Sequence, residues 1–274
     1  RAIARSVLSG RMLVGALMGF VSGLPLLLTG SVLQAWMKED GVDLATIGWF
    51  ALAGLPYTLK FVWAPLFDRF VPNALGRRRG WLLLVQLALI GALVLLAGSS
   101  PATSPLGVAV AALLVTFFSA SQDIVVDAYR REVLADDEQG LGAALAVNGY
   151  RLGMLLASGG GLILADHWAF PTVYLFMAGC MLVGVATTLL APEPGAPAGR
   201  PRSLREAVVD PFVDYFRRPD AVVILLLILL YKIGDAMAAH MTTPFYLDVG
   251  FTKTEIGAVV KLFGFWATVA GGLV

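Results

Sequence analysis

Ionisable side chains inside long apolar stretches are the residues of this sequence that can do chemistry. Six of them lie inside such stretches: Lys60, Asp123, Asp127, Arg151, Lys232 and Asp235. A charge at the centre of a membrane helix costs about 2.5 to 3.5 kcal/mol on insertion scales, so such groups face a cavity or a partner. A carboxylate placed there can load and release a proton, because burial and nearby cations move its pKa in opposite directions.

Spacing brings some of these groups onto common helix faces. Asp123 and Asp127 are four residues apart, and Ser119 lies one turn earlier, so in a helix the three side chains form one stripe. Lys232 and Asp235 are three residues apart and can also share a face. The sequence therefore predicts two polar sites on otherwise apolar helices.

Two roles compete for each buried charge, a structural ion pair or a site role in substrate binding or proton relay. Asp123, Arg151 and Asp235 lie deep in their apolar stretches, which favours the site role, although Arg151 could instead pair with Asp123. Asp127 lies near a helix end, which favours a structural role. For Lys60 the sequence leaves two alternatives: a role in the site, or extension of its ammonium group to the membrane surface.

Composition places these charges in a membrane protein. The chain has 274 residues, 58% hydrophobic and 14% charged, whereas soluble domains carry about 25% charged residues. A soluble enzyme or a nucleic-acid-binding protein is therefore excluded. The net charge of +1 names no acidic partner, and one cysteine with two dispersed histidines supplies neither a disulfide framework nor a metal site. We expect no cofactor.

Apolar stretches long enough to cross a bilayer, which takes roughly 20 residues, recur along the chain. They predict an all-α polytopic fold with seven spans and the start of an eighth, at 12–36, 45–66, 81–98, 106–127, 141–165, 170–191, 221–247 and 254–274. The sequence starts without Met and stops inside an apolar stretch, so we expect a fragment. Tryptophans near the predicted span ends indicate an interfacial belt: Trp36, Trp63, Trp81 and Trp168.

The distribution of basic residues predicts the orientation, because cytoplasmic loops carry the excess of Lys and Arg. With the N-terminus inside, most of the 20 basic residues face the cytosol. They are Arg1, Arg5, Arg11, Arg69, Arg77, Arg78, Arg79, Arg130, Arg131, Arg200, Arg202, Arg205, Arg217 and Arg218. Only Lys38 and Lys253 fall on the predicted outer side.

A Pro/Gly-rich linker divides the chain. It predicts a six-helix half at 1–191, a cytosolic linker with an amphipathic helix at 192–220, and the first two helices of a second half at 221–274. The turns 40–48 and 249–257 share two glycines and an isoleucine at the same spacing. This internal similarity favours two parallel halves, the architecture of the major facilitator superfamily. A glycine-rich stretch, Ser158–Gly161, predicts close helix packing.

The loop after the second span resembles a motif of that superfamily. Asp68-Arg69 is followed by Gly76-Arg77-Arg78-Arg79, similar to the family's Asp-Arg and Gly-Arg-Arg pattern. Ala64 stands where the motif has its first glycine, and the spacing between its two parts is longer. The resemblance implies that Asp68, Arg69, Arg77 and Arg78 help to lock two halves together on the cytosolic side.

Several stretches read together resemble the AmpG-type muropeptide permeases of the superfamily. They are Phe20–Thr29, Leu33–Met37, Lys60–Arg69, Gly76–Trp81, Ser119–Ala128, Gly149–Gly153 and Tyr231–Ala236. The resemblance implies proton-coupled import of N-acetylglucosaminyl-1,6-anhydro-N-acetylmuramic acid, with or without peptide, across the inner membrane of a Gram-negative bacterium. Such import feeds peptidoglycan recycling and β-lactamase induction. The expected partners are the muropeptide, protons and the lipid bilayer, with the protein as a monomer.

This chemistry assigns roles to the polar residues. Hydroxyls and carboxylates of the substrate suit Gln34, Ser119, Ser121, Gln122, Asn148, Arg151 and Lys232, and proton coupling suits Asp123 and Asp235. The alternative transporter is a related facilitator of another large anion, such as an acyl-CoA. A membrane-embedded enzyme or lipid scramblase is a third alternative, but His240 has no nucleophile partner identifiable from spacing, so we expect no enzyme.

Overall fold

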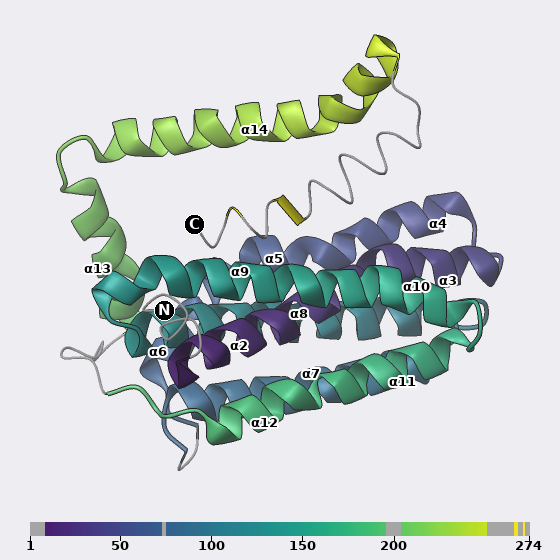
Figure 1. The fold of residues 1–274 in the computed structure, drawn as a ribbon, viewed down its shortest axis with the longest axis horizontal. Helices are drawn as coiled ribbons and strands as arrows, with labels where there is room; N and C mark the ends of the chain where they lie inside the picture. The colour runs from purple at the N-terminus through teal and green to yellow at the C-terminus, as the bar shows by residue number, and fades with distance from the viewer. Residues whose placement is uncertain (1–8, 73–74, 196–203, 251–265, 268–270, 272–274) are drawn as a thin grey trace. The chain divides into compact units, whose positions relative to one another are not determined.

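The computed structural model describes residues 9–72, 75–195, 204–250, 266–267 and 271, all within an all-α fold (Figure 1). The chain divides into two compact units, Arg1–Arg200 and Pro201–Val274. Several predictions lie outside the described residues: Arg1, Arg5, Arg200, Arg202, Lys253, loop residues 251–257 and nearly all of the span 254–274. The predicted division into three segments stays a prediction.

The first unit contains helices at all six predicted spans. In the first three spans these are α2 (Gly10–Leu27), the π-helical segment η1 (Leu28–Val32), α3 (Leu33–Glu39), α4 (Leu44–Trp49), the 3₁₀ segment η2 (Phe50–Gly54), α5 (Leu55–Leu59), the 3₁₀ segment η3 (Lys60–Val62), α6 (Ala64–Arg69) and α7 (Arg78–Ala97). The rest are α8 (Pro105–Val133), the 3₁₀ segment η4 (Asp136–Glu138), α9 (Gln139–Leu155), the π-helical segment η5 (Leu156–Gly160), α10 (Gly161–Ala165), α11 (Phe170–Cys180) and α12 (Leu182–Leu190).

Four of these helical stretches are each long and apolar enough to cross a membrane. They are Gly10–Glu39, Arg78–Ala97, Pro105–Val133 and Phe170–Leu190. The second and fifth spans are helical over similar lengths but change their winding between α, 3₁₀ and π along the way. The chain is therefore a multi-pass membrane protein whose first, second and fifth spans contain irregular turns.

Prolines account for the irregular second span. Pro56 has no N–H to donate to the carbonyl of Leu52, and Pro65 has none for the carbonyl of Phe61. Each proline sits in the first turn of a new α-helical segment, where its missing donor costs nothing. The interrupted hydrogen bonding produces the 3₁₀ turns η2 and η3 just before these restarts.

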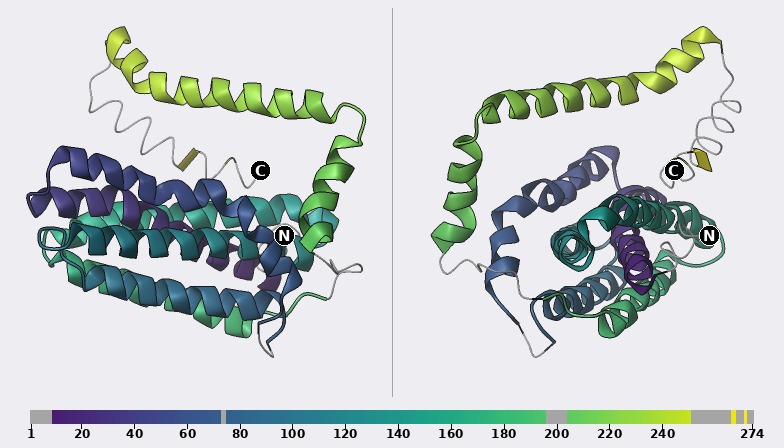
Figure 2. Two further views of the ribbon diagram at one scale, coloured as in Figure 1. Left: turned by 180° about the vertical axis from the view of Figure 1, so that it is seen from behind. Right: turned by 60° about the vertical axis from the view of Figure 1, so that its left-hand side comes forward.

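Glycines allow α2 and α9 to pack with their backbones in contact. A Cβ added to Gly19 or Gly23 would overlap the carbonyl oxygens of Ala146 and Tyr150, and one added to Gly149 or Gly153 would overlap the carbonyls of α2. The spacing of four residues on both helices is the small-residue pattern of close helix pairs in membranes. In Figure 2, α2 lies between α9 on one side and α12 on the other, and it contacts both.

This seam differs from the predicted packing glycines. In the stretch Ser158–Gly161, Gly159 and Gly160 contact only leucine side chains of their own turn, and Gly161 alone meets other helices. Ser158 to Gly160 belong to η5, and Gly161 begins α10; η5 contacts η1 of the first span. Tyr174 donates a hydrogen bond of 2.7 Å to the carbonyl of Leu28, where the winding changes to π. The irregular segments of two spans thus lie together.

The tryptophan belt prediction is wrong for Trp36. Its side chain is buried in the larger apolar core, with ring centres 5.8 Å from Phe170 and 5.4 Å from Tyr174. Trp63 is also turned into the bundle, where its indole N–H donates to Ser121. Trp168 is exposed, as an interfacial residue would be. Trp36 and Trp63 instead pack against aromatic rings inside the bundle, because a planar ring fills the space between helices well.

The second unit holds α13 (Leu204–Phe216) and α14 (Ala221–Val249). α13 continues through Pro211, although a proline inside a helix favours a kink, and it exposes Phe212 and Phe216. Gly250 follows α14 with φ of 103°, and Gly41 follows α3 with φ of 78°. These are the paired glycines of the two similar loops, and both take the left-handed conformation that ends a helix.

The α2–α9 seam yields a prediction at two glycines of one helix. Gly19→Ala should lower the apparent unfolding temperature in detergent, because the new methyl group meets the backbone of Ala146; overpacking of this kind costs about 1–3 kcal/mol. Gly15→Ala is the matched control, since nothing lies within 4 Å of its added Cβ. Equal unfolding temperatures for both variants would contradict the proposed backbone contact.

Candidate functional site

Asp123 is the buried charge around which the candidate site is built. It lies on α8, and its Oδ2 is 3.8 Å from the ammonium nitrogen of Lys60 in η3. Its Oδ1 is buried and has no hydrogen-bond partner among the described residues. The alternative pair with Arg151 is wrong: within the described part, Arg151 makes no ion pair, and Lys60 takes that place. The Asp123 carboxylate is thus half-satisfied.

Polar side chains of α8 also hold its neighbours. Tyr57 donates a hydrogen bond of 2.9 Å to Ser119, and Trp63 donates one of 3.0 Å to Ser121. Gln122 donates one of 3.2 Å to Ser22 of α2. The three predicted substrate-binding residues of α8 are therefore covered by other helices, and in this unit they support the walls of the site.

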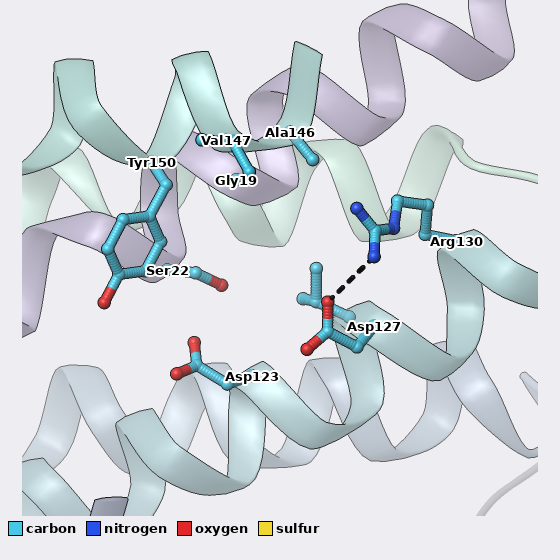
Figure 3. A pocket seen from close by; sticks show the side chains of 9 residues that line it. Gly19, Ser22, Asp123, Asp127, Arg130, Ala146, Val147 and Tyr150 are labelled. Carbon is cyan, nitrogen blue, oxygen red and sulfur yellow. Dashed lines mark hydrogen bonds and ion pairs between the residues drawn. The ribbon is translucent and has the colours of Figure 1, made fainter. Parts of the chain in front are cut away.

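A pocket of about 180 Å³ opens beside Asp123, between α2, α8 and α9 (Figure 3). It is lined by Gly19, Ser22, Asp123, Val126, Asp127, Arg130, Ala146, Val147 and Tyr150. Figure 3 shows the hydroxyl of Ser22 above the carboxylate of Asp123, with the ring of Tyr150 beside them. At about 30 Å³ per water molecule the pocket holds a small water cluster, whereas ligand pockets usually measure about 300–1,000 Å³. It suits water and protons better than a disaccharide.

Asp127 lies at the rim of this pocket and pairs with Arg130. The two charged groups are 3.4 Å apart, and the Asp127 side chain is 66% exposed. This surface pair on one helix agrees with the structural role favoured for Asp127.

Three other predicted site residues of the first unit do not line this pocket. Asn148 is buried and Arg151 is half-buried, both on α9, whereas Gln34 is exposed on α3. Lys232 and Asp235 lie on α14 in the second unit; Lys232 is exposed, and the side chain of Asp235 is outside the described part. Ser119, Ser121, Gln122 and Asp123 are the predicted residues that the structure does bring together.

A second charged group, here called the arginine cluster, comprises Asp68, Arg77, Arg78, Glu132 and Glu193. Glu132, at the end of α8, accepts hydrogen bonds of 2.7 Å from Arg77 and of 2.6 and 3.0 Å from Arg78. Asp68 accepts another of 2.7 Å from Arg78. The two arginine side chains are only 5% and 4% exposed, so both guanidinium groups depend on these carboxylates.

Glu193 completes the cluster at the start of α7. Its two oxygens accept from the backbone N–H groups of Arg78 and Arg79, each at 2.9 Å. These N–H groups have no partner inside the helix, and a carboxylate at a helix N-terminus is also favoured by the helix dipole. The predicted gate residue Arg69 takes a different place, with its guanidinium 5.3 Å from the ring centre of Phe70.

Sequence reasoning missed the acceptors and the aromatic donors of both clusters. Glu132 directly follows Arg130-Arg131, which were interpreted as cytosolic loop residues. Glu193 stands between two prolines of the predicted linker. Neither position indicated a contact with the arginines of the loop motif. Tyr57 and Trp63 flank Lys60 at a spacing of three residues, which is the one local signal that could have linked them.

Comparison with known proteins gives consistent similarities. The family model of the Major Facilitator Superfamily matches residues 15–274. The chain is 48% identical to the Anhydromuropeptide permease of Escherichia coli (strain K12) over 259 residues, which cover 94% of this chain and 53% of that protein. It is 41% identical to an uncharacterized protein of Haemophilus influenzae, covering 99% of this chain and 65% of that one.

A more distant relative is the Putative transporter AmpG 4 of Rickettsia felis, which is 36% identical over 266 residues. The match covers 93% of this chain and 64% of that protein. The chain thus spans from about half to just under two thirds of the length of these three relatives.

The arginine cluster predicts a large difference between two carboxylates near the same end of α8. Glu132→Gln should strongly lower the apparent unfolding temperature, because removing one partner of a buried ion pair costs about 3–5 kcal/mol. Asp136→Asn is the control: it breaks a pair with Arg131 whose side chains are 65% and 89% exposed, and such pairs contribute at most about 1 kcal/mol. Similar small shifts for both would show that the cluster is not holding α7 and α8 together.

Proposed function

Since the chain belongs to the major facilitator superfamily, we propose that it forms part of a proton-coupled symporter of anhydromuropeptides. The cargo is N-acetylglucosaminyl-1,6-anhydro-N-acetylmuramic acid with or without peptide, carried from periplasm to cytoplasm across the inner membrane of a Gram-negative bacterium. Resemblance to the AmpG-type permeases supports this cargo. Such import would feed peptidoglycan recycling and β-lactamase induction.

The single observation that carries proton coupling is the half-satisfied carboxylate of Asp123. One oxygen faces Lys60, while the other is buried without a partner beside a pocket large enough for water. A proton arriving through that water can bind the unpaired oxygen without breaking an existing hydrogen bond. Asp235 on α14 is the second proposed coupling residue, on the strength of its position in an apolar helix.

Arg151 is the proposed anion-binding residue. It is a half-buried cation on α9, and no carboxylate of the described part neutralises it. The muramic acid and the peptide both carry carboxylates, which a guanidinium binds with two parallel hydrogen bonds. Gln34, Asn148 and Lys232 are proposed to meet other hydroxyls and carboxylates of the same cargo. Ser119, Ser121 and Gln122 are proposed to hold the neighbouring helices in place through their hydrogen bonds to Tyr57, Trp63 and Ser22.

The arginine cluster is proposed to lie on the cytosolic side, with the N-terminus of the chain on that side too. The concentration of arginines at that end of the first unit supports this orientation. Asp68, Arg77 and Arg78 would then act as a cytosolic gate.

The coupling proposal predicts separate effects on accumulation and on binding. Proteoliposomes carrying the full-length protein should accumulate labelled anhydro-disaccharide when the outside is acidic, and a protonophore should abolish accumulation. Asp123→Asn should abolish gradient-driven accumulation while leaving binding near the wild-type level, since it removes the proton acceptor and keeps the shape. Asp137→Asn, at an exposed carboxylate of the 3₁₀ segment η4, is the control.

Three outcomes would count against parts of the proposal. Uptake unaffected by the protonophore would end the coupling claim. Absence of uptake in the wild type would end the cargo claim. Loss of binding in Asp123→Asn as complete as its loss of accumulation would reassign Asp123 to substrate contact.

The anion-binding proposal predicts a charge-specific effect of Arg151. Arg151→Gln should raise the KM for the carboxylate-bearing disaccharide about tenfold or more, because hydrogen bonds to charged groups contribute about 1.5–3 kcal/mol. The same variant should transport an amidated, uncharged disaccharide as well as the wild type does. Arg151→Lys should recover part of the loss. Equal losses on both substrates would indicate a packing role instead.

A further inference from the structure

Polar contacts join the middle of the second span to α8. From Leu44 to Arg69, only Ala53 and Phe67 are buried. Most of the large apolar side chains of this span are exposed: Leu44, Trp49, Leu52, Leu55, Leu59, Phe61, Val62 and Leu66. Apolar packing of this span is limited to Ile47, Phe50 and Ala53 at the larger core and to Trp63 and Phe67 at the smaller one. Its contacts with α8 include two hydrogen bonds, from Tyr57 and Trp63, and the ion pair of Lys60 with Asp123.

The winding of the span aims these three side chains at α8. Tyr57, Lys60 and Trp63 follow at intervals of three residues, which is the repeat of a 3₁₀ helix. In an α-helix the first and last would point about 120° apart, at about 100° per residue. The 3₁₀ turn at Lys60–Val62 reduces this divergence, so all three reach α8. The segment is thus shaped for polar contact at some cost in regular hydrogen bonding.

The ion pair in the middle of this contact depends on charge. The Asp123 side chain is 13% exposed on a continuous helix, while that of Lys60 is 37% exposed and already reaches outward. Other titratable groups near the carboxylate are Asp127 with Arg130 on α8 and Tyr150 on α9, which line the same pocket, and Tyr57 on the second span. Among the described residues, Lys60 is the one cation with a nitrogen within 4.0 Å of the Asp123 carboxylate.

We propose that Lys60 is a positioning residue that couples the seating of the second span on α8 to the ionisation of Asp123. This inference rests on the proposed function, which supplies the proton. A proton from pocket water binds the unpaired Oδ1 of Asp123, and the carboxylate becomes a neutral acid. Lys60 keeps its proton, loses its counter-charge and turns to water, and the second span loosens from α8. Release of the proton seats it again.

Paired spin labels on the full-length protein in lipid nanodiscs test this proposal. The labels go on Phe61→Cys of the second span and Gly91→Cys of α7, both exposed positions, in a Cys180→Ser background. The distance distribution should shift between mildly alkaline and mildly acidic buffer. Lys60→Gln and Asp123→Asn should each give the acidic distribution in both buffers, and Lys60→Arg should restore the shift.

Tyr57→Phe is the matched control, because it removes the neighbouring hydrogen bond to Ser119 without changing a charge. It should keep the shift with pH. A pH-independent distribution in the wild type, or a shift retained in Lys60→Gln, would overturn the inference. If either of these results were found while uptake still followed the proton gradient, the inference about Lys60 would fail and the proposed function would stand. If uptake did not depend on the proton gradient, the proposed function itself would fail.

Discussion

The backbone contact between α2 and α9 determines where the polar groups of the candidate site lie. With no side chain at Gly19 or Gly23, α2 rests directly on the carbonyls of Ala146 and Tyr150. Ser22, next to one of these glycines, and Tyr150 are thereby brought to the level of Asp123 on α8. Because lipid offers no hydrophobic drive between helices, such close packing is a main source of cohesion in a membrane bundle. The pocket exists at the edge of this seam.

Much of the fold followed from the sequence, because apolar length alone predicts membrane helices. The helices of the first unit lie where the apolar stretches placed them. The depth of Asp123 in its span led to its prediction as a site residue, and that role stays a prediction. The packing glycines were not predicted. The run Ser158–Gly161 drew attention because its glycines are adjacent, whereas the contacts of Gly19 and Gly153 depend on the register between two helices. Register is a tertiary property that a single helix does not encode.

The partners of the charged groups were harder still to predict. Depth in a span suggested Arg151 for Asp123, but direction around the helix axis decides contacts. Pro56 and Pro65 alter the winding of the second span, which changes where Lys60 points. Similarly, the loop motif supplied Arg77 and Arg78, but their acceptors Glu132 and Glu193 come from distant positions in the chain.

The two charged clusters differ in how completely their acceptors are used, and this difference separates their roles. Both oxygens of Glu132 and both of Glu193 accept hydrogen bonds, so a proton could bind there only by displacing a donor. At Asp123 one oxygen is buried and has no donor in the described part, and the side chain lines a pocket large enough for water. A saturated carboxylate keeps helices in place, whereas a half-satisfied one can change its charge at lower cost. Under the proposed function, the first unit would combine a fixed end with a titratable centre, as proton coupling requires.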